Sequence, residues 1–390
     1  MKVLIIAHNQ GIQGAGIAFA NLCNGLASMG IKVIAVVPSS KGVAQLIDKN
    51  DNIRMYVIKY IKNEVFPNFR SIKDKIRYLP RLIRVWVYRP FFRSRLEEIV
   101  KIEKPDIIHS NTGTIRIGSE VAERNNIPHV WHVRECQKLG YNYKPFGGEG
   151  KVRDLFERKN NHCIAITKSV YDYYRLNSTK DKIIYDGVFS DKIIQTLRTN
   201  VMKNKVLLYV GLLSEKKGVR MLLESFERIS HKIKDYELWL VGNDQIGIKD
   251  IISKMQAKSQ IKYLGFRSDI YKLMAESKVV VVPSEYEGFG FITVEAMLNG
   301  TMVVGRDTAG TKEQFDNGNK LIGSEIGFRF ITENELDSQL LRAISLQEKD
   351  YVSITEKAFK VVSNMYSIEK HVNNVIEYYH EILEEKYSEY

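Results

Sequence analysis

The sequence predicts an α/β protein of two Rossmann-like, doubly wound domains that face a cleft. Short apolar runs alternate with helical patterns along the chain, which is typical of a parallel sheet covered by helices. The alternation weakens near residues 186–205, where polar residues dominate, and then restarts. A length of 390 residues also exceeds the ~250–300 at which a single core stops growing. Ligands of such sheets bind outside the carboxyl ends of strands, so chemistry is expected in the loops after strands.

The first domain is predicted to open with a strand, a glycine-rich loop and a helix. Lys2–Ala7 is the apolar strand, and Gly30 ends the helix that follows the loop. The apolar face of that helix has the spacing i, i+3, i+4, i+7: Phe19, Leu22, Cys23 and Leu26. Further strands are predicted at Lys32–Val37, Arg54–Ile58, Asp106–His109, Pro128–Val133, Cys163–Thr167 and Lys182–Tyr185.

The second domain repeats this pattern with strand Lys205–Val210, loop Gly211–Gly218 and helix Val219–Ile229. Its other strands are predicted at Glu237–Val241, Ile261–Leu264, Val279–Val282 and Met302–Val304. We therefore expect an N-terminal domain at residues 1–190 and a second domain at residues 191–365. Residues 366–390 form one long helical pattern, which we expect to pack back on the first domain.

The composition limits the environment and the partners. Cys23, Cys136 and Cys163 are widely spaced and form no zinc-like cluster, which favours a reducing, cytoplasmic location. No apolar stretch approaches the ~20 residues that span a bilayer. The net charge of +12 would attract nucleic acid, anionic lipid or phosphorylated ligands. No nucleic-acid recognition motif is evident, so no nucleic-acid partner is expected.

The first loop reads GIQGAG and includes Gly14 and Gly16. Such glycines let backbone N–H groups approach a phosphate at a helix N-terminus. The order is not the G-x-G-x-x-G dinucleotide fingerprint, and no acidic residue ends the next strand, so NAD is disfavoured. A merely flexible turn is the alternative. The second loop carries Lys216 and Lys217, which could reach a diphosphate or could be ordinary solvated lysines.

The third loop follows the apolar strand Val279–Val282 and holds Glu287 and Glu295 on either side of a glycine turn. A carboxylate accepts two hydrogen bonds, which suits the vicinal hydroxyls of a sugar or a ribose. An acidic residue placed near a helix N-terminus is the alternative explanation. It would account for one glutamate and not for the turn between the pair.

This segment resembles the glutamate-x7-glutamate signature of the family 4 retaining glycosyltransferases, which have the GT-B architecture. The similarity covers most of the second domain and, more loosely, the first. It includes the segments 285–290, 295–297, 300–301, 211–218, 263–270, 185–188 and 309–313, together with Trp131–Glu135.

The resemblance implies that residues 1–190 form the acceptor-side domain and residues 191–365 the nucleotide-sugar-binding domain. It also implies roles for individual residues. Glu295 would hold the ribose hydroxyls, Glu287 the hydroxyls of the donor sugar, and Lys217 the diphosphate. His132 would lie near the donor sugar and the acceptor, and Glu287, His132 and Lys217 are the implied catalytic residues. The other implied donor contacts are Gly14, Gly16, Lys216, Arg267, Phe289, Gly290 and Thr311.

One position departs from the family pattern. Leu212 stands where the family usually has an arginine, whose fork would hold the leaving diphosphate in a bidentate manner. Lys216, Arg267 and Arg306 are candidates to compensate. No acidic pair suited to a metal ends a strand, so no metal and no cofactor are expected.

The segment Asn68–Arg95 is basic and aromatic, with Asp74 as its one acidic residue. This composition favours peripheral attachment to an anionic membrane surface. Two ordinary helices with a basic outer face are the alternative, and Pro80 and Pro90 are expected to break any single helix.

The predicted function is retaining transfer of a sugar from a nucleotide-sugar, with a UDP-sugar favoured, to a saccharide or lipid-linked acceptor in cell-surface polysaccharide or glycolipid synthesis. A sugar-nucleotide 2-epimerase is an alternative of similar architecture, which the seven-residue glutamate spacing disfavours. A non-catalytic partner subunit is a second alternative, because of Leu212. A basic nucleic-acid-binding protein is a third.

Overall fold

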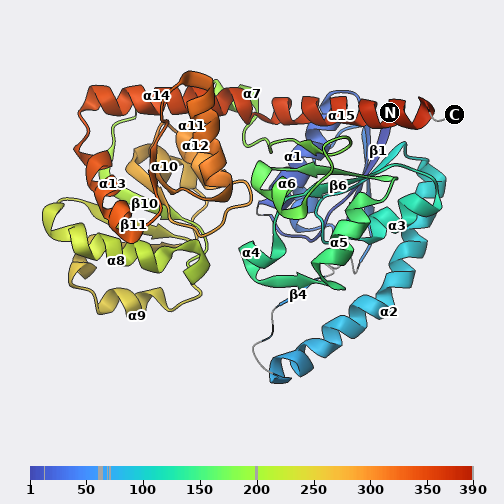
Figure 1. Cartoon of the computed structure of the whole chain (residues 1–390), viewed down its shortest axis with the longest axis horizontal. Coiled ribbons are helices and arrows are strands. Elements are labelled where there is room, and N and C mark those ends of the chain that lie inside the picture. The colour runs from blue at the N-terminus through green and yellow to red at the C-terminus, as the bar shows by residue number, and fades with distance from the viewer. Residues whose placement is uncertain (13, 60–64, 68, 70–71, 198–200, 389–390) are drawn as a thin grey trace. The chain divides into compact units, whose positions relative to one another are not determined.

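The computed structural model describes the whole chain except residues 13, 60–64, 68, 70–71, 198–200 and 389–390. The chain forms two compact units (Figure 1). Unit 1 comprises Met1–Gly187 and Ile368–Tyr390, and unit 2 comprises Val188–Ser367.

Unit 1 is built on a sheet with the strand order β3-β2-β1-β5-β6-β8-β9, in which every pair is parallel. The strands are β1 (Lys2–Ile6), β2 (Lys32–Val37), β3 (Ile53–Val57), β5 (Ile107–Ser110), β6 (His129–Val133), β8 (Asn161–Ala165) and β9 (Lys182–Ile183). The strands β5, β6 and β8 are buried along their whole length. Strands covered on both faces are rich in apolar residues, but these three also carry buried polar side chains, among them His109, His132 and Asn161.

Helices cover both faces of this sheet. The side chains of α1 (Ala15–Ser28) and α15 (Ile368–Ser388) pack together with β1 and β2 in one cluster, which includes Phe19, Val375 and Tyr379. The C-terminal half of α2 (Ile72–Glu103) and α3 (Ile117–Arg124) contribute Leu96 and Val121 to the cluster on the other face. The remaining helices are α4 (Gln137–Tyr141), α5 (Gly148–Glu157) and α6 (Lys168–Tyr174), and β4 (Val65–Pro67) pairs with β7 (Tyr143–Pro145).

The expectation that Pro80 and Pro90 break the basic segment is wrong, because both lie inside the single helix α2. Each proline lacks a backbone N–H and leaves the carbonyl four residues earlier without its helical partner. Both prolines lie on exposed positions of α2, as do Ile76 and Trp86, so these carbonyls can bond to water instead. The N-terminal part of α2 extends away from the rest of unit 1 (Figure 1).

Unit 2 has a second parallel sheet with the order β12-β11-β10-β13-β14-β15. Its strands are β10 (Asn204–Val210), β11 (Glu237–Val241), β12 (Ile261–Gly265), β13 (Ser277–Val282), β14 (Met302–Arg306) and β15 (Phe328–Phe330). Its helices are α7 (Asp191–Ile194), α8 (Val219–Ile229), α9 (Ile248–Ser253), α10 (Ile270–Glu276), α11 (Phe291–Leu298), α12 (Ala309–Ile322), α13 (Glu333–Ser345) and α14 (Glu348–Met365).

The strand orders confirm the predicted doubly wound α/β fold. In unit 2, β10 lies between β11 and β13, so the order of the sheet reverses beside β10. In unit 1, the same reversal occurs between β1 and β5. Loops that leave neighbouring strands at such a point diverge to opposite faces and leave room for a ligand at the carboxyl edge. Within the described ranges, no helix combines the length and the hydropathy that crossing a bilayer requires.

Candidate functional site

In unit 2, the loops after β10 and β13 bring Lys217 and Glu287 together. These strands are neighbours at the reversal point, so their loops begin side by side although the two residues are 70 positions apart. The Nζ of Lys217 donates a hydrogen bond to Oε1 of Glu287 at 2.7 Å. Both side chains remain partly exposed, which leaves the pair accessible to a ligand.

Backbone contacts fix how closely these two loops approach. Gly218 has a φ of 70°, and a Cβ on it would lie 2.1 Å from the carbonyl oxygen of Pro283. Only glycine permits that approach, because any side chain would collide with a backbone atom. The N–H of Glu285 also donates to the carbonyl of Lys216 at 3.0 Å. The position of Lys217 relative to Glu287 is therefore set by the backbone rather than by the ion pair alone.

A third loop, at the start of α12, holds the turn that follows Glu287. The N–H of Gly310 donates to the carbonyl of Glu287 at 2.9 Å. The side-chain amide of Gln314 donates to the carbonyls of Phe289 at 2.6 Å and Gly290 at 3.2 Å. Thr311 is buried beside this turn. The N-terminus of α12 thus brings its partial positive charge to the loop that carries Glu287, which suits an anionic ligand.

Glu295 is a buried carboxylate with spare hydrogen-bonding capacity. It lies on α11 and is 8% exposed. Its Oε1 accepts a hydrogen bond from the hydroxyl of Tyr271 at 3.3 Å, and its Oε2 has no partner among the described residues. Burial raises the pKa of Glu295 to about 7, against the opposing hydrogen bond from Tyr271. A buried acceptor without a partner is costly, so this oxygen suits a ligand that donates hydroxyls.

The other predicted residues of unit 2 lie in different settings. Phe289 is buried, and its ring packs on Phe291 and Tyr366, so only its backbone can face a ligand. Arg267 is exposed and makes two hydrogen bonds to Asp269, at 2.8 and 2.6 Å. Leu212 is half-exposed, and its carbonyl accepts a hydrogen bond from Tyr209 at 2.8 Å. The remaining predicted positions are the partly buried Lys216 and Arg306 and the buried Gly290, which has a φ of 89°.

In unit 1, the glycine loop after β1 leads into α1. Gly14 is exposed, has a φ of 45° and precedes the first residue of the helix. Gly16 is buried, and a Cβ on it would lie 2.0 Å from the carbonyl oxygen of Gly11. The turn itself therefore requires glycine at position 16, whatever the loop binds.

His132 lies at the end of β6 and is fully buried. Its Nδ1 lies 3.2 Å from Nε2 of His109, whose Nδ1 in turn contacts the hydroxyl of Tyr379 on α15 at 2.5 Å. Burial and, second, the charge of Arg134 hold the pKa of His132 well below its usual range. His132 is therefore neutral at physiological pH and belongs to an interior polar network.

His132, Asp186 and His371 form a group whose ligand atoms lie within 4.8 Å of one another, which is the arrangement a metal ion would need. However, Arg134 donates hydrogen bonds to both carboxylate oxygens of Asp186. The negative charge of Asp186 is thus already balanced, and a divalent cation would face a buried guanidinium. This chemistry favours an internal charge network over a metal site.

Several residues of these sites were missed by the sequence analysis. Tyr271 and Gln314 lie on α10 and α12, in otherwise ordinary helical patterns, and carried no signal. Asp186 and His371 are 185 positions apart and come together only because α15 packs on the sheet of unit 1.

Both halves of the chain match models of known protein families. Residues 12–191 match the family model described as Glycosyltransferase Family 4, and residues 191–361 match Glycosyl transferases group 1. An uncharacterised glycosyltransferase of Methanocaldococcus jannaschii is 25% identical over 55% of this chain and 61% of its own length. This match therefore spans less than two thirds of that relative. The UDP-Gal:alpha-D-GlcNAc-diphosphoundecaprenol alpha-1,3-galactosyltransferase of Escherichia coli is 24% identical over 83% of this chain and 88% of its own length.

Among solved structures, the Anabaena protein HepE in complex with UDP has a TM-score of 0.73 at 20% identity, over 97% of this chain and 99% of HepE. A complex of the same protein with UDP-glucose has a TM-score of 0.71. At this identity the likeness establishes the fold. Taken with the two family models, which together span residues 12–361, it shows that this chain belongs to the group 1, family 4 glycosyltransferases with the GT-B fold.

Proposed function

We propose that this chain is a retaining glycosyltransferase that moves a sugar from a UDP-sugar to a saccharide or lipid-linked acceptor in cell-surface polysaccharide or glycolipid synthesis. The observation that carries the proposal is the set of charges in unit 2. One cation, Lys217, is paired with a carboxylate on a glycine-held turn, and Glu295 presents a buried oxygen that still needs a donor. The UDP complexes of HepE and the UDP-galactose enzyme of Escherichia coli support the choice of UDP.

In this mechanism the donor replaces the ion pair. The diphosphate forms an ion pair with the ammonium of Lys217. The carboxylate of Glu287 is then free to accept hydrogen bonds from the sugar hydroxyls. Glu295 accepts the ribose hydroxyls. As the bond from the anomeric carbon to the diphosphate breaks, negative charge grows on the leaving group, and Lys217 with the N-terminus of α12 stabilises it there. The acceptor oxygen bonds to the anomeric carbon on the face that the diphosphate leaves, and the leaving phosphate takes the proton of that hydroxyl, so configuration is retained.

This scheme supplies the positive charge from the protein itself, so we propose that turnover needs no metal. Full loss of turnover in chelator, restored by adding a divalent cation, would contradict this part of the proposal.

A thermal-shift panel tests the donor assignment. UDP and UDP-sugars should stabilise the protein, and GDP, ADP and dTDP with their sugars should do so less. A ligand at a hundred times its Kd stabilises by ~2.7 kcal/mol, which is readily measured. If none of these nucleotides moves the melting temperature, the glycosyltransferase proposal fails.

A non-catalytic partner subunit is the second candidate function, because Leu212 stands where the family usually has the guanidinium of an arginine. Measuring UDP release distinguishes the two functions: an enzyme releases UDP from the donor when acceptor is added, and a binding subunit does not. A 2-epimerase would instead change the sugar at its second carbon with no acceptor present.

We also propose that unit 1 attaches to an anionic membrane surface through α2. Six apolar side chains lie on one side of this helix and are at least half exposed: Ile72, Ile76, Leu79, Ile83, Trp86 and Val87. The first five follow one another at alternating spacings of four and three residues, and Val87 follows Ile83 by four. We call these residues the α2 stripe. Spacing of this kind places side chains along one helix face. The part of the segment at residues 68, 70 and 71 lies outside the described residues.

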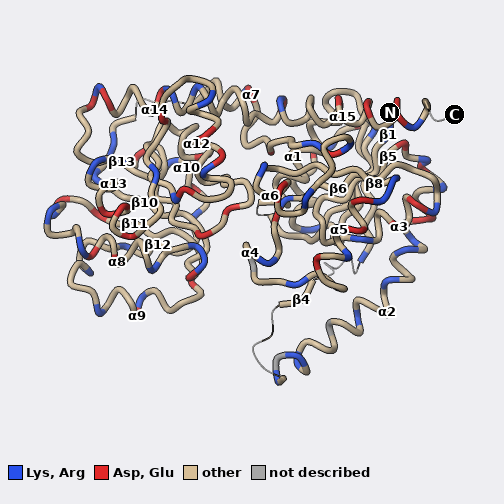
Figure 2. The backbone as a smooth tube through the Cα atoms, in the orientation of Figure 1, with Lys and Arg blue, Asp and Glu red and all other residues tan. Residues whose placement is uncertain are grey.

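The charge of α2 favours lipid over a second copy of the chain as the occupant of the α2 stripe. Lys73, Arg77 and Arg84 flank the stripe, and Lys and Arg predominate along α2 in Figure 2. A second α2 would bring like charges together, whereas anionic headgroups would neutralise them. An apolar face flanked by basic residues, with a tryptophan, is typical of helices that lie in the membrane interface.

A triple variant in which Ile76, Ile83 and Trp86 are all changed to serine should bind phosphatidylglycerol vesicles at least tenfold more weakly, because each apolar side chain buried in the membrane contributes about 1.5–3 kcal/mol. Co-sedimentation measures this. The control variant carries Met202→Ser and Ile331→Ser, two exposed apolar residues of unit 2, and should bind like wild type. Equal binding by the triple variant and wild type would exclude the α2 stripe as the attachment site.

A further inference from the structure

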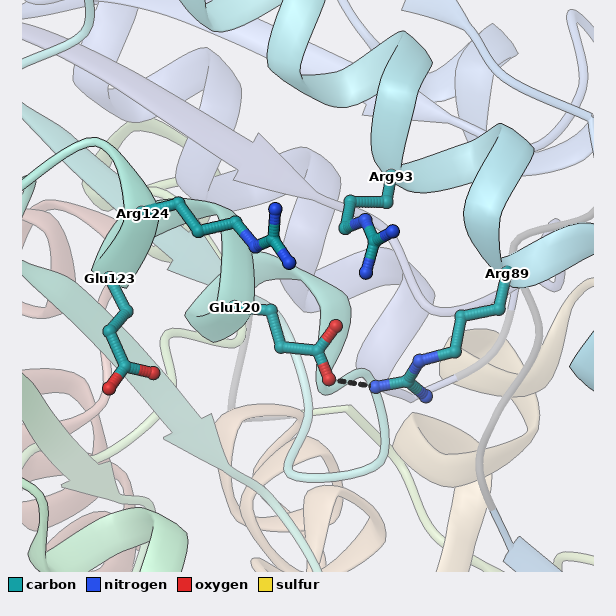
Figure 3. Close-up of a pocket in the computed structure, with 5 residues that line it drawn as sticks. All are labelled: Arg89, Arg93, Glu120, Glu123 and Arg124. Carbon is teal, nitrogen blue, oxygen red and sulfur yellow. Dashed lines mark hydrogen bonds and ion pairs between the residues drawn. The ribbon is translucent and has the colours of Figure 1, made fainter.

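A pocket of about 390 Å³ lies between α2 and α3 in unit 1 (Figure 3). Its lining consists of three arginines and two glutamates: Arg89, Arg93, Glu120, Glu123 and Arg124. The volume is within the range of small-molecule sites. No aromatic ring is present among these five residues to stack on a base, so the pocket differs in kind from the nucleotide site proposed in unit 2.

The glutamates of this pocket are already neutralised. Glu120 accepts a hydrogen bond from Arg89, the contact drawn as a dashed line in Figure 3. Glu123 pairs at 2.6 Å with Arg158, which is not part of the lining. The carboxylate of Glu123 points away from the arginines in Figure 3. Neither glutamate therefore balances the charge of the remaining two arginines.

The two remaining guanidinium groups face one another. In Figure 3 the side chains of Arg93 and Arg124 extend from opposite helices toward the same space. Among the described residues, Arg124 has one ion pair, a long contact of 3.7 Å to Glu97. Among the residues that the structure describes, no carboxylate lies within ion-pair distance of Arg93. Like charges in this arrangement repel, and an anion between them would be held from both sides. Guanidinium groups bind phosphate in a bidentate manner.

The position of the pocket on α2 identifies the source of the anion. Arg93 follows Trp86 by seven residues, and seven residues rotate a helix to within ~20° of its starting direction. Arg93 therefore leaves α2 on nearly the same side as Trp86 of the α2 stripe, two turns further along. If the stripe lies among lipid chains, Arg93 is on the side of the helix that meets the headgroups.

We infer that the pocket of Arg93 and Arg124 binds the phosphate group of an anionic lipid headgroup and so orients unit 1 on the membrane. The inference rests on the proposed function, in which α2 lies on an anionic membrane surface. It adds a specific headgroup site to an attachment that would otherwise depend on net charge and apolar area.

The test compares two variants of equal net charge. Arg93→Gln with Arg124→Gln should lower binding to phosphatidylglycerol vesicles at least tenfold. Lys49→Gln with Lys101→Gln, two exposed lysines of unit 1 outside the pocket, should change it by less than threefold. The single variant Arg93→Lys, which keeps the charge and loses the fork, should fall between wild type and the double variant. If both double variants lose binding equally, only net charge matters and the inference is wrong.

A titration without vesicles shows whether the pocket binds a lipid headgroup or a free phosphate compound. Glycerol 3-phosphate is titrated into wild type without vesicles, and weak or no binding is expected because the α2 stripe has no lipid to enter. Tight binding that Arg93→Gln with Arg124→Gln abolishes, together with vesicle binding unchanged in that variant, would assign the pocket to a soluble phosphate and overturn the inference.

UDP binding distinguishes the failure of this inference from that of the proposed function. Both double variants should keep the wild-type melting temperature and the wild-type shift with UDP, because that site lies in unit 2. A normal UDP shift with unchanged vesicle binding in Arg93→Gln with Arg124→Gln refutes the headgroup site alone. Loss of vesicle binding in that variant, in a protein that never responds to any nucleotide, supports the headgroup site and refutes the donor assignment.

Discussion

Replacing Lys217 with alanine should lower kcat/KM by roughly 10²- to 10³-fold, the loss typical of removing one preorganised group from a developing negative charge. The effect should be at the upper end because Leu212 cannot share that charge. Lys217 is the one described cation that contacts Glu287. Turnover of a UDP-sugar with saturating acceptor measures the loss.

The stability of the variant shows whether this loss is chemical. The pair of Lys217 and Glu287 is partly exposed, and pairs of this kind contribute about 0–1 kcal/mol to folding. The melting temperature of Lys217→Ala should therefore stay close to that of wild type. Lys262→Ala breaks a matched 2.7 Å ion pair with Glu237 at the far edge of the same sheet and should leave turnover unchanged. Near-normal turnover of Lys217→Ala would remove Lys217 from the mechanism.

The fold was predictable because its signals are local. Buried parallel strands are mostly apolar, and their helices are amphipathic, so most elements appear at or near their predicted bounds. The helix predicted at Val219–Ile229 is α8 at the same bounds. The strands that escaped prediction, β4, β7 and β15, have three residues each, too few to show a period. The prediction that Pro80 and Pro90 break the helix was wrong, because the carbonyls that these prolines leave without a partner are exposed and can be hydrated.

The candidate site was predictable only where a motif marks it. Glycines around Glu287 and Lys217 are visible in the sequence because the backbone there admits no side chain, as at Gly218. Partners supplied by a distant helix leave no such mark. Tyr271 on Glu295 and Gln314 on the glycine turn are known from their hydrogen bonds in three dimensions. The interior setting of His132 was equally invisible, because α15 and the loop at Asp186 enclose it from elsewhere in the sequence.

Replacing Glu295 with glutamine should weaken UDP-glucose binding about 10- to 100-fold, because a hydrogen bond to a charged group contributes ~1.5–3 kcal/mol.

The ribose hydroxyls donate to this carboxylate, so binding requires its ionised form. With a pKa of about 7, only a minor fraction of Glu295 is ionised at pH 6. Wild-type affinity should therefore fall about tenfold from pH 8 to pH 6, since apparent affinity scales with the competent fraction. The affinity of Glu295→Gln should be flat over this range. Calorimetric titration measures both.

Folding stability of the ligand-free protein should respond to pH in the opposite direction. The folded-state pKa of Glu295, about 7, lies above the usual glutamate value of 4.5. Its contribution to stability is therefore fully present below pH 4.5 and is lost as pH rises through 7. Relative to Glu295→Gln, wild type should gain melting temperature as pH falls from 8 to 5 while it loses affinity for UDP-glucose. Glu276→Gln, on the helix that carries Tyr271, should match wild type in both measurements. If the stability of wild type relative to Glu295→Gln instead falls as pH falls, burial does not raise the pKa of Glu295 in the folded protein, and the prediction is wrong.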